Sequence, residues 1–188
     1  MAISDSLDQQ IENAVSALRA GGVIAYPTEY CYGLGCDPNN DQALERLIGI
    51  KRRRAEQGVI LIAAELDHVH HYAELDTLPL AEKIRDSWPG PNTWLLPTKE
   101  SVSSWVKGHH NTVAMRVTAH PTSRLLCEKF GGAIVSTSAN RHGQKVLMSA
   151  SAIADEMGVE LDCIVDAPLG GASEPSVIQH GVSGERQR

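Results

Sequence analysis

Short, continuously apolar runs alternate along this chain with segments whose apolar residues recur at helical spacing. Residues 23–26 read Val-Ile-Ala-Tyr and residues 59–63 read Val-Ile-Leu-Ile-Ala, so neither run has a polar face. A strand without a polar face is buried on both sides, which is typical of sheets that are covered by helices. The alternation therefore predicts an α/β fold with a mainly internal sheet.

Further strands are predicted where short apolar or β-branched segments stand between turn signals. These strands cover residues 93–96, 113–117, 134–137, 163–165 and 177–178. Two helices are predicted at 11–18, with a stop at Gly21-Gly22, and at 43–48, with Asn40 or Asp41 as the N-cap. Three more are expected at 78–88, from Pro121 to a stop at Gly131-Gly132, and at 151–157.

The length and charge of the chain narrow the functional classes. A chain of 188 residues, of which 42% are hydrophobic, can bury a full core, and we expect one domain that covers residues 1–188. The formal net charge of −6 disfavours a wholesale polyanion binder, so any contact with nucleic acid must use a local basic patch. No apolar run approaches the roughly 18 residues that span a membrane, and no secretory signal is visible. We therefore expect a cytoplasmic location.

The cysteines give no sign of a metal centre. They are Cys31, Cys36, Cys127 and Cys163, and none forms a C-x-x-C pair with another. Zinc ligands commonly come in such pairs, and structural disulfides are rare in chains without an export signal. We expect buried free thiols and no metal site.

Two segments in the first third of the chain hold more polar chemistry than folding alone requires. Residues 26–38 follow a predicted strand and bring hydroxyls, a carboxylate and two glycines into a predicted loop, where binding groups concentrate. A Gly/Pro-rich turn would have the same composition. Residues 51–54, Lys-Arg-Arg-Arg, follow a predicted helix. They are either a solvated cap that favours the helix dipole or an anion clamp suited to a polyphosphate.

Two later segments raise the same choice. Arg116 interrupts the apolar strand at 113–117, and a buried arginine needs an anion, either an internal carboxylate or a group on a ligand. At 136–140, Ser-Thr-Ser-Ala-Asn follows a buried strand. Ligands bind at such strand ends in α/β sheets, and hydroxyls and amides suit phosphate oxygens, a nucleobase or an amino acid. A plain Ser/Thr turn is the other interpretation.

Together, these segments resemble the YrdC/TsaC family in their order and spacing. The matching motifs are Tyr26-Pro-Thr-Glu with Tyr32-Gly-Leu-Gly, Lys51-x-Arg53, Trp88-Pro-Gly-Pro-x-Thr93, Arg116-Val-Thr with His120-Pro121, Ser136-Thr-Ser-Ala-Asn140, Gly170-Gly171 and Pro175-Ser176-x-Ile178. They extend over about residues 8–180, and the length is similar to that of the single-domain bacterial form. The resemblance implies a twisted, largely buried sheet, flanked by helices around a concave basic cavity, as in the similar dihydroxybutanone-phosphate synthase fold.

The same resemblance implies an enzyme, L-threonylcarbamoyladenylate synthase, which is a nucleotidyltransferase. Such an enzyme converts L-threonine, bicarbonate or CO₂, and ATP into threonylcarbamoyl-AMP and pyrophosphate. Partner proteins then transfer the threonylcarbamoyl group to the tRNA adenosine next to the anticodon, which forms N6-threonylcarbamoyladenosine. ATP enters as a substrate, with Mg²⁺ held mainly through its phosphates. Weak binding of tRNA or double-stranded RNA is also expected.

Residue roles follow from the resemblance position by position. The family's Lys, Arg, Ser, Asn signature maps onto Lys51, Arg53, Ser138 and Asn140, and Lys51 and Arg53 are expected to be catalytic. The expected substrate- and nucleotide-binding residues are Thr28, Tyr32, Arg54, Arg116, Thr118, Ser136, Ser138, Asn140 and Ser176. Where relatives commonly have Pro and Lys, this chain has Arg54 and Gln57, and Arg54 is expected to replace the missing charge.

Three other functions fit parts of this pattern. A non-catalytic module that binds tRNA or double-stranded RNA would use a concave basic face, although the net charge of −6 argues against RNA as the main ligand. The carbamoyl-transfer role of related domains in hydrogenase maturation proteins is a second alternative. Dihydroxybutanone-phosphate synthase is a third, but its acidic metal-binding loop is not evident in this sequence.

Overall fold

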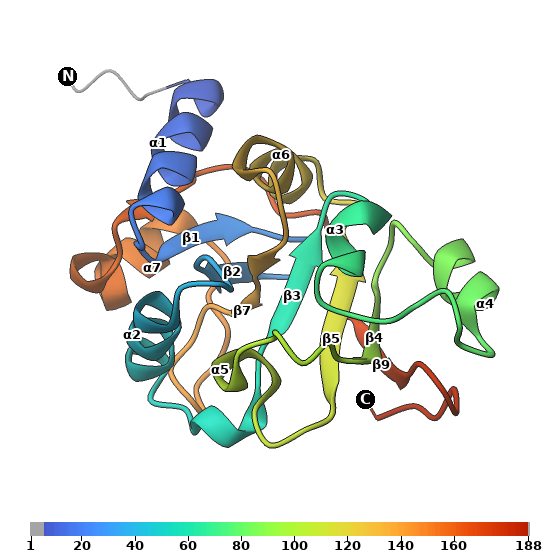
Figure 1. Ribbon diagram of the computed structural model, residues 1–188. Helices are drawn as coiled ribbons and strands as arrows, with labels where there is room; N and C mark the ends of the chain where they lie inside the picture. Colours follow the sequence, from blue (N-terminus) through green and yellow to red (C-terminus); the bar gives the residue numbers. More distant parts are fainter. Residues whose placement is uncertain (1–5, 188) are drawn as a thin grey trace.

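The structure, a computed structural model, describes residues 6–187. Within them, strands in two sheets are surrounded by helices (Figure 1). The strands are β1 (Ile24–Pro27), β2 (Tyr32–Gly35), β3 (Ile60–Ala63), β4 (Asn92–Pro97), β5 (Thr112–Val117), β6 (Ile134–Val135), β7 (Thr137–Ser138), β8 (Cys163–Ile164) and β9 (Val177–His180). The helices are α1 (Leu7–Arg19), α2 (Asp41–Lys51), α3 (Leu66–His70), α4 (Ala81–Asp86), α5 (Ser104–Lys107), α6 (Pro121–Phe130) and α7 (Ala150–Met157), with 3₁₀ turns η1 (Ala55–Gln57) and η2 (Gly158–Glu160).

A short segment of chain links the edge strand of one sheet directly to the edge strand of the other. The four-stranded sheet has the order β7-β2-β1-β8, in which β1 and β8 are parallel and the other pairs antiparallel. The five-stranded sheet has the order β6-β3-β5-β4-β9, in which β3 is parallel to β5 and β4 to β9. Between β6 and β7 stands the single residue Ser136. The chain therefore passes from one sheet into the other at this point.

Apolar packing fixes the position of the helices on the sheets. The side chains of Ile11, Val15 and Leu18 on α1 are buried against β1 and α6 in one apolar cluster. A larger cluster contains Leu34 of β2 and Leu61 of β3, both fully buried. Burying each such side chain stabilises the fold by about 1.5–3 kcal/mol, so these clusters hold both sheets in place.

The predicted α/β class is confirmed, and most predicted elements occur within a few residues of their expected bounds. Asn40, one of the two residues expected to cap the second helix, is the N-cap, and its side chain accepts a hydrogen bond from the Ala43 amide at 3.1 Å. No helix among residues 6–187 has the length and apolarity that a membrane span requires.

Three features differ from the prediction. The helix expected at 78–88 covers only Ala81–Asp86, because the conformational limits around Pro79 and Pro89 restrict it at both ends. The strand expected at 134–137 is divided between the two sheets, where the sequence suggested one internal sheet. Within the expected loop at 26–38, Tyr32–Gly35 forms strand β2.

Glycine in β2 is required by a close backbone approach. A Cβ atom at Gly35 would lie 2.6 Å from the Val135 carbonyl oxygen and 2.7 Å from the Tyr26 ring. The Tyr26 hydroxyl donates to the same carbonyl at 2.9 Å, and the Val135 amide donates to the Cys36 carbonyl at 3.0 Å. This contact joins the two sheets where residues 134–138 cross between them.

Candidate functional site

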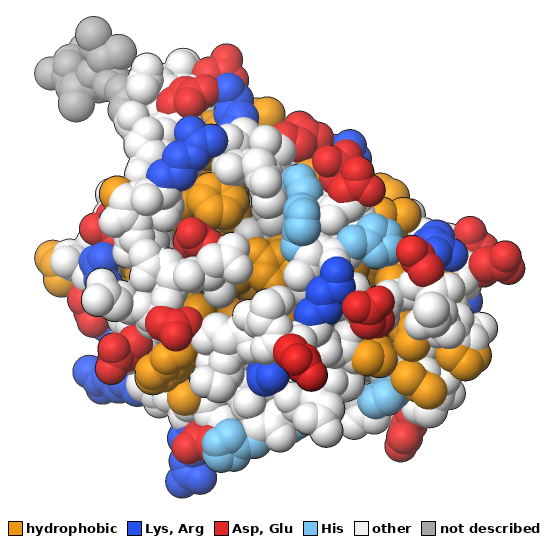
Figure 2. All heavy atoms as spheres, in the orientation of Figure 1, with side chains coloured by type: hydrophobic (Ala, Val, Ile, Leu, Met, Phe, Trp, Pro, Cys, Tyr) orange, Lys and Arg blue, Asp and Glu red, His pale blue; other side chains and the backbone are white. Residues whose placement is uncertain are grey.

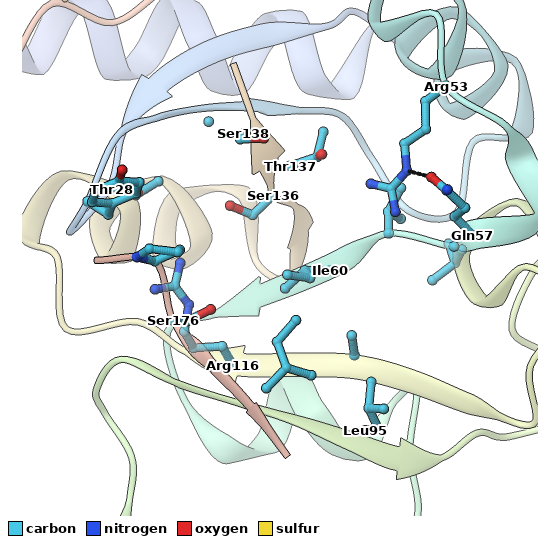
Figure 3. Close-up of a pocket in the computed structure, with 18 of the residues that line it drawn as sticks. Thr28, Arg53, Gln57, Ile60, Leu95, Arg116, Ser136, Thr137, Ser138 and Ser176 are labelled. Atoms are coloured by element: carbon cyan, nitrogen blue, oxygen red, sulfur yellow. Dashed lines mark hydrogen bonds between the residues drawn. The ribbon is translucent and has the colours of Figure 1, made fainter. Parts of the chain in front are cut away.

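A cavity of about 510 Å³ lies beside the segment that joins the two sheets. It is lined from the β1–β2 turn, the segment between α2 and β3, one face of β5, the β6–β7 crossover and the start of β9. On β5 the lining residues are Thr112, Ala114 and Arg116, since alternate side chains of a strand point to the same side. In Figure 3, Thr28 and Arg53 lie at opposite ends of the cavity, with residues 136–138 between them. We call these the Thr28 end and the Arg53 end.

The Arg53 end is formed where α2 stops. Arg52 follows the helix in the left-handed conformation with φ 52°, so the chain reverses and Arg53 reaches the cavity wall. There the Arg53 Nε donates to the Gln57 Oε1 at 2.7 Å, as the dashed line in Figure 3 shows. This bond orients the guanidinium and leaves its two terminal nitrogens for other acceptors. Burial lowers the pKa of Arg53.

Lys51 lies behind the cavity wall and is not a lining residue. Its side chain is buried, and its Nζ donates to the Asn140 carbonyl at 3.0 Å, to the Asn140 Oδ1 at 3.1 Å and to the Ser138 carbonyl. These three acceptors match the three N–H donors of an ammonium. Burial and the charge of Arg53 lower the pKa of Lys51 to about 8. The geometry therefore assigns Lys51 to holding the segment from Ser138 to Asn140.

Arg116 pairs with an internal carboxylate, which answers one choice that the sequence left open. Its Nη1 donates to the Glu29 Oε2 at 2.9 Å, and both side chains are largely buried. Glu29 also accepts from the Thr118 hydroxyl at 2.8 Å and the Ala119 amide at 3.1 Å. Burial raises the pKa of Glu29, but Arg116 and these hydrogen bonds outweigh it and hold that pKa below its usual value. The Arg116 Nε is buried without a partner among the described residues.

The β6–β7 crossover contributes hydroxyl groups. Ser136, Thr137 and Ser138 line the cavity, and the Ser136 amide donates to the Ile60 carbonyl at 2.8 Å. The Ser138 hydroxyl donates to the Asn140 Oδ1 at 2.7 Å, while the Asn140 Nδ2 donates to the Gln144 carbonyl at 2.7 Å. Asn140 is thus held by its own loop and does not line the cavity.

Three further predicted residues line the cavity around its Thr28 end. The hydroxyl of Thr28 donates to the Cys31 carbonyl at 2.7 Å, and that of Tyr32 donates to the Ala167 carbonyl at 2.9 Å. Ser176 accepts from the Thr93 hydroxyl at 2.9 Å. The Tyr32 oxygen also accepts from the Ala167 amide at 3.4 Å. The Thr28 hydroxyl oxygen can accept a hydrogen bond from a ligand.

The structure thus brings most, but not all, predicted site residues to one cavity. The lining residues among them are Thr28, Tyr32, Arg53, Arg116, Ser136, Ser138 and Ser176. Lys51, Thr118 and Asn140 contact or support these residues from behind. Arg54 is exposed and does not line the cavity.

Sequence reasoning missed a part of the wall that comes from α5 and the turn after it. Lys107, His110 and Thr112 line the cavity, and none of the three was among the expected site residues. A run of lysine, glycine and two histidines has no spacing that indicates a ligand. What places this segment at the cavity is its backbone hydrogen bonding to residues 56–59, which a single sequence does not reveal.

The charge around the site is local. Among the described residues, the cavity is lined by no aspartate or glutamate, whereas Arg53, Lys107 and Arg116 contribute cationic groups. On the face drawn in Figure 2, by contrast, acidic and basic side chains are interspersed. Within residues 6–187, no group of three or more His, Cys, Asp and Glu side chains is arranged to hold a metal ion. The cavity therefore suits an anionic ligand of limited size.

Comparison with known proteins agrees with this arrangement. The sequence model of the family Sua5_yciO_yrdC, which is described as "Telomere recombination", matches residues 16–187. The chain belongs to the Sua5/YciO/YrdC family. The resemblance that was inferred from the motifs is therefore confirmed.

Relatives within this family match the chain over nearly its whole length. The threonylcarbamoyl-AMP synthase of Coxiella burnetii (strain RSA 493 / Nine Mile phase I) is 43% identical over 182 residues, which are 96% of this chain and 97% of the relative. The enzyme of the same name from Chromohalobacter salexigens is 46% identical over 180 residues, with 95% and 96% covered.

Solved structures of the family share the fold. The crystal structure of P. abyssi Sua5 complexed with L-threonine matches with a TM-score of 0.86 and 29% identity, over 95% of this chain and 52% of that one. The chain therefore spans about half the length of that Sua5 protein. E. coli YciO matches with a TM-score of 0.78 and 26% identity, over 98% of this chain and 92% of that one.

Proposed function

We propose that this protein is a threonylcarbamoyl-AMP synthase, an enzyme that joins L-threonine, bicarbonate or CO₂, and ATP with release of pyrophosphate. The observation that carries the proposal is the identity of 43–46% to proteins of that name over almost the full length of both chains. The cavity provides an independent physical argument, since hydroxyl groups and a neutralised arginine line one end and cations line the other. Threonine fits the first end and a polyphosphate the second.

The reaction needs positioning more than it needs a reactive side chain. The threonine amine adds to CO₂ and loses a proton, which gives a carbamate. One carbamate oxygen then attacks the α-phosphorus of ATP in line, and the bond from that phosphorus to the bridging oxygen of the β-phosphate breaks. The products are threonylcarbamoyl-AMP and pyrophosphate. Holding both substrates in one cavity supplies a large part of the rate enhancement of such a transfer.

The cations of the Arg53 end stabilise the leaving group. Negative charge grows on pyrophosphate as the bond breaks, and a fixed guanidinium beside it lowers the barrier. Arg53 is already oriented by Gln57, so its charge needs no rearrangement during the reaction. Lys51 acts on this step by fixing the segment from Ser138 to Asn140, of which Ser138 lines the cavity between the two ends.

The Thr28 end holds the amino acid. The Arg116 Nε is buried and has no partner among residues 6–187, so a ligand oxygen there would satisfy it. Glu29 keeps the guanidinium in place while cancelling much of its charge. The hydroxyls of Thr28 and Ser176 are suited to the threonine amine and side chain.

Mg²⁺ is proposed to enter bound to the phosphates of ATP. The described residues contain no acidic cluster that would hold the ion by itself, whereas phosphate oxygens are ligands that Mg²⁺ prefers. When bound, it would neutralise part of the phosphate charge. The protein's own residues hold and orient the nucleotide.

The product is proposed to leave for partner proteins that modify tRNA. Threonylcarbamoyl-AMP is a mixed anhydride, so the group that it contains can be transferred to the N6 amine of an adenosine. Because the product is used on tRNA, we also propose a cytoplasmic location and weak contact with tRNA.

A pyrophosphate-release assay tests the proposed function. Purified protein is given ATP, L-threonine and bicarbonate, and each is omitted in turn. We expect release only with all three present, and mass spectrometry should detect threonylcarbamoyl-AMP. Pyrophosphate release that is unchanged without threonine would refute the proposal.

A further inference from the structure

The cationic side chains that line the cavity differ in how far the protein neutralises them. Arg116 forms an ion pair with Glu29, at 2.9 Å. By contrast, no ion pair within residues 6–187 involves Arg53 or Lys107. Since no carboxylate lines the cavity in the described part of the chain, these two cations are left to a ligand.

Backbone contacts place Lys107 at the Arg53 end. The Val59 amide donates to the Val106 carbonyl at 2.8 Å, and the His109 amide donates to the Glu56 carbonyl at 3.2 Å. These two hydrogen bonds stand on either side of Lys107 and align it with residues 56–59. Figure 1 shows α5 next to the turn that precedes β3.

Gly108, in the turn after α5, allows this turn to lie close to residues 56–59. Gly108 has φ 62°, and a Cβ atom there would lie 2.2 Å from the Glu56 carbonyl oxygen. A side chain at this position would push the two segments apart. The glycine therefore keeps Lys107 in place beside the wall that contains Arg53 and Gln57.

We propose that Lys107 binds the polyphosphate of ATP together with Arg53. The Lys107 side chain is half-buried in the cavity wall, and it forms no ion pair with any of the described residues. A polyphosphate has several charged oxygens, and two cations from opposite segments can hold two of them. This inference rests on the proposed function, because it takes ATP as the ligand.

Lys107 also provides the charge that its neighbours do not. Gln57 is neutral and its carbonyl oxygen already accepts from Arg53. Arg54, which the sequence suggested for this role, is exposed outside the cavity. The cation thus comes from α5, a segment remote in sequence from residues 51–57.

Steady-state kinetics of Lys107→Gln test the proposal. We expect the KM for ATP in pyrophosphate release to rise about tenfold, the usual effect of losing one charge-assisted hydrogen bond, and the KM for threonine to stay within about twofold. Lys107→Arg should keep the KM for ATP near that of the unmodified protein. Lys83→Gln on α4, which does not line the cavity, is the matched control and should leave both constants unchanged.

A binding measurement completes the test. Calorimetry with inorganic triphosphate as the probe should show the same order of affinities without turnover. An unchanged affinity for ATP and triphosphate in Lys107→Gln would overturn the proposal. Because triphosphate binding needs no reaction, it separates this outcome from a failure of the proposed function.

Discussion

Lys51→Met tests whether this buried ammonium is structural, catalytic or both. The family resemblance implied a catalytic Lys51, and if that were its only role, methionine would reduce turnover and leave stability unchanged. In the structure, the Lys51 Nζ instead donates to three oxygens of Ser138 and Asn140. Those oxygens lose their donor in the variant, so the free energy of unfolding should fall as well.

The magnitude follows from two opposing contributions. Three hydrogen bonds from a charged donor contribute about 5 kcal/mol at the low end of the usual range. Against this stand the burial of the charge and its repulsion by Arg53, which lower the pKa of Lys51 to about 8 and correspond to about 3 kcal/mol. The net loss is about 2 kcal/mol. For a domain of this size, that should lower Tm by roughly 4–8 °C.

Differential scanning calorimetry and threonine-dependent pyrophosphate release measure the two effects on the same protein. Lys145→Met is the matched control, since Lys145 is exposed in the segment after Asn140, and its Tm should stay within about 1 °C. We expect Lys51→Met to lower both Tm and kcat. A Tm equal to that of the control, with kcat lost, would refute the structural role and restore the purely catalytic one.

Three further predictions concern the ends of the cavity and pH. In urea titrations, Arg116→Ala should destabilise the protein by about 3–5 kcal/mol, because it leaves the largely buried Glu29 charge unpaired. Arg54→Ala, at an exposed site, should change stability by less than about 0.5 kcal/mol. A larger effect of Arg54→Ala than of Arg116→Ala would contradict this assignment of the two arginines. Serine should have a kcat/KM about 10–200-fold below that of threonine, because a methyl pocket contributes about 1–3 kcal/mol, and equal values would exclude such a pocket. The pKa of Lys51 is lowered to about 8, so between about pH 8 and the ordinary lysine pKa of 10.5 the unfolded chain binds more protons than the folded one. In that window the stability of the protein should therefore rise with pH relative to that of Lys51→Met, by about 3 kcal/mol at most. Parallel pH profiles of stability for the two proteins would disprove the shift.

The sequence predicted the elements of this fold better than their pairing. Apolar period and capping signals placed α1, α2 and β3 within a few residues, because those signals are local. The division of residues 134–138 between two sheets depends on contacts with Cys36 and Ile60, which lie far away in sequence. The same limit explains why Tyr32–Gly35 was expected to be a loop, since Gly35 is needed only because Val135 passes close to it.

For the site, the sequence identified residues of unusual local chemistry, but their roles depend on contacts with residues that are remote in sequence. Residues with an unusual polar character for their position, such as Arg116 in an apolar strand, were found from the sequence. Whether Arg116 faced a ligand or Glu29 was undecidable without the fold, because the two are 87 residues apart. Lys107 had no unusual local character and was missed for that reason.

The joining of two sheets at residue 136 accounts for the form of the cavity. Had residues 134–138 continued in one sheet, alternate side chains would point to opposite sides, and of the three hydroxyl residues only Ser136 and Ser138 would share a face. Because the chain changes sheets at Ser136, Thr137 also reaches the cavity, and three successive hydroxyl residues lie between the Arg53 end and the Thr28 end. Lys51 holds the far side of this crossover through the Ser138 and Asn140 carbonyls. The burial of the Lys51 charge is by itself unfavourable for folding. Because this side chain holds the crossover, the distance between the Arg53 end and the Thr28 end depends on it.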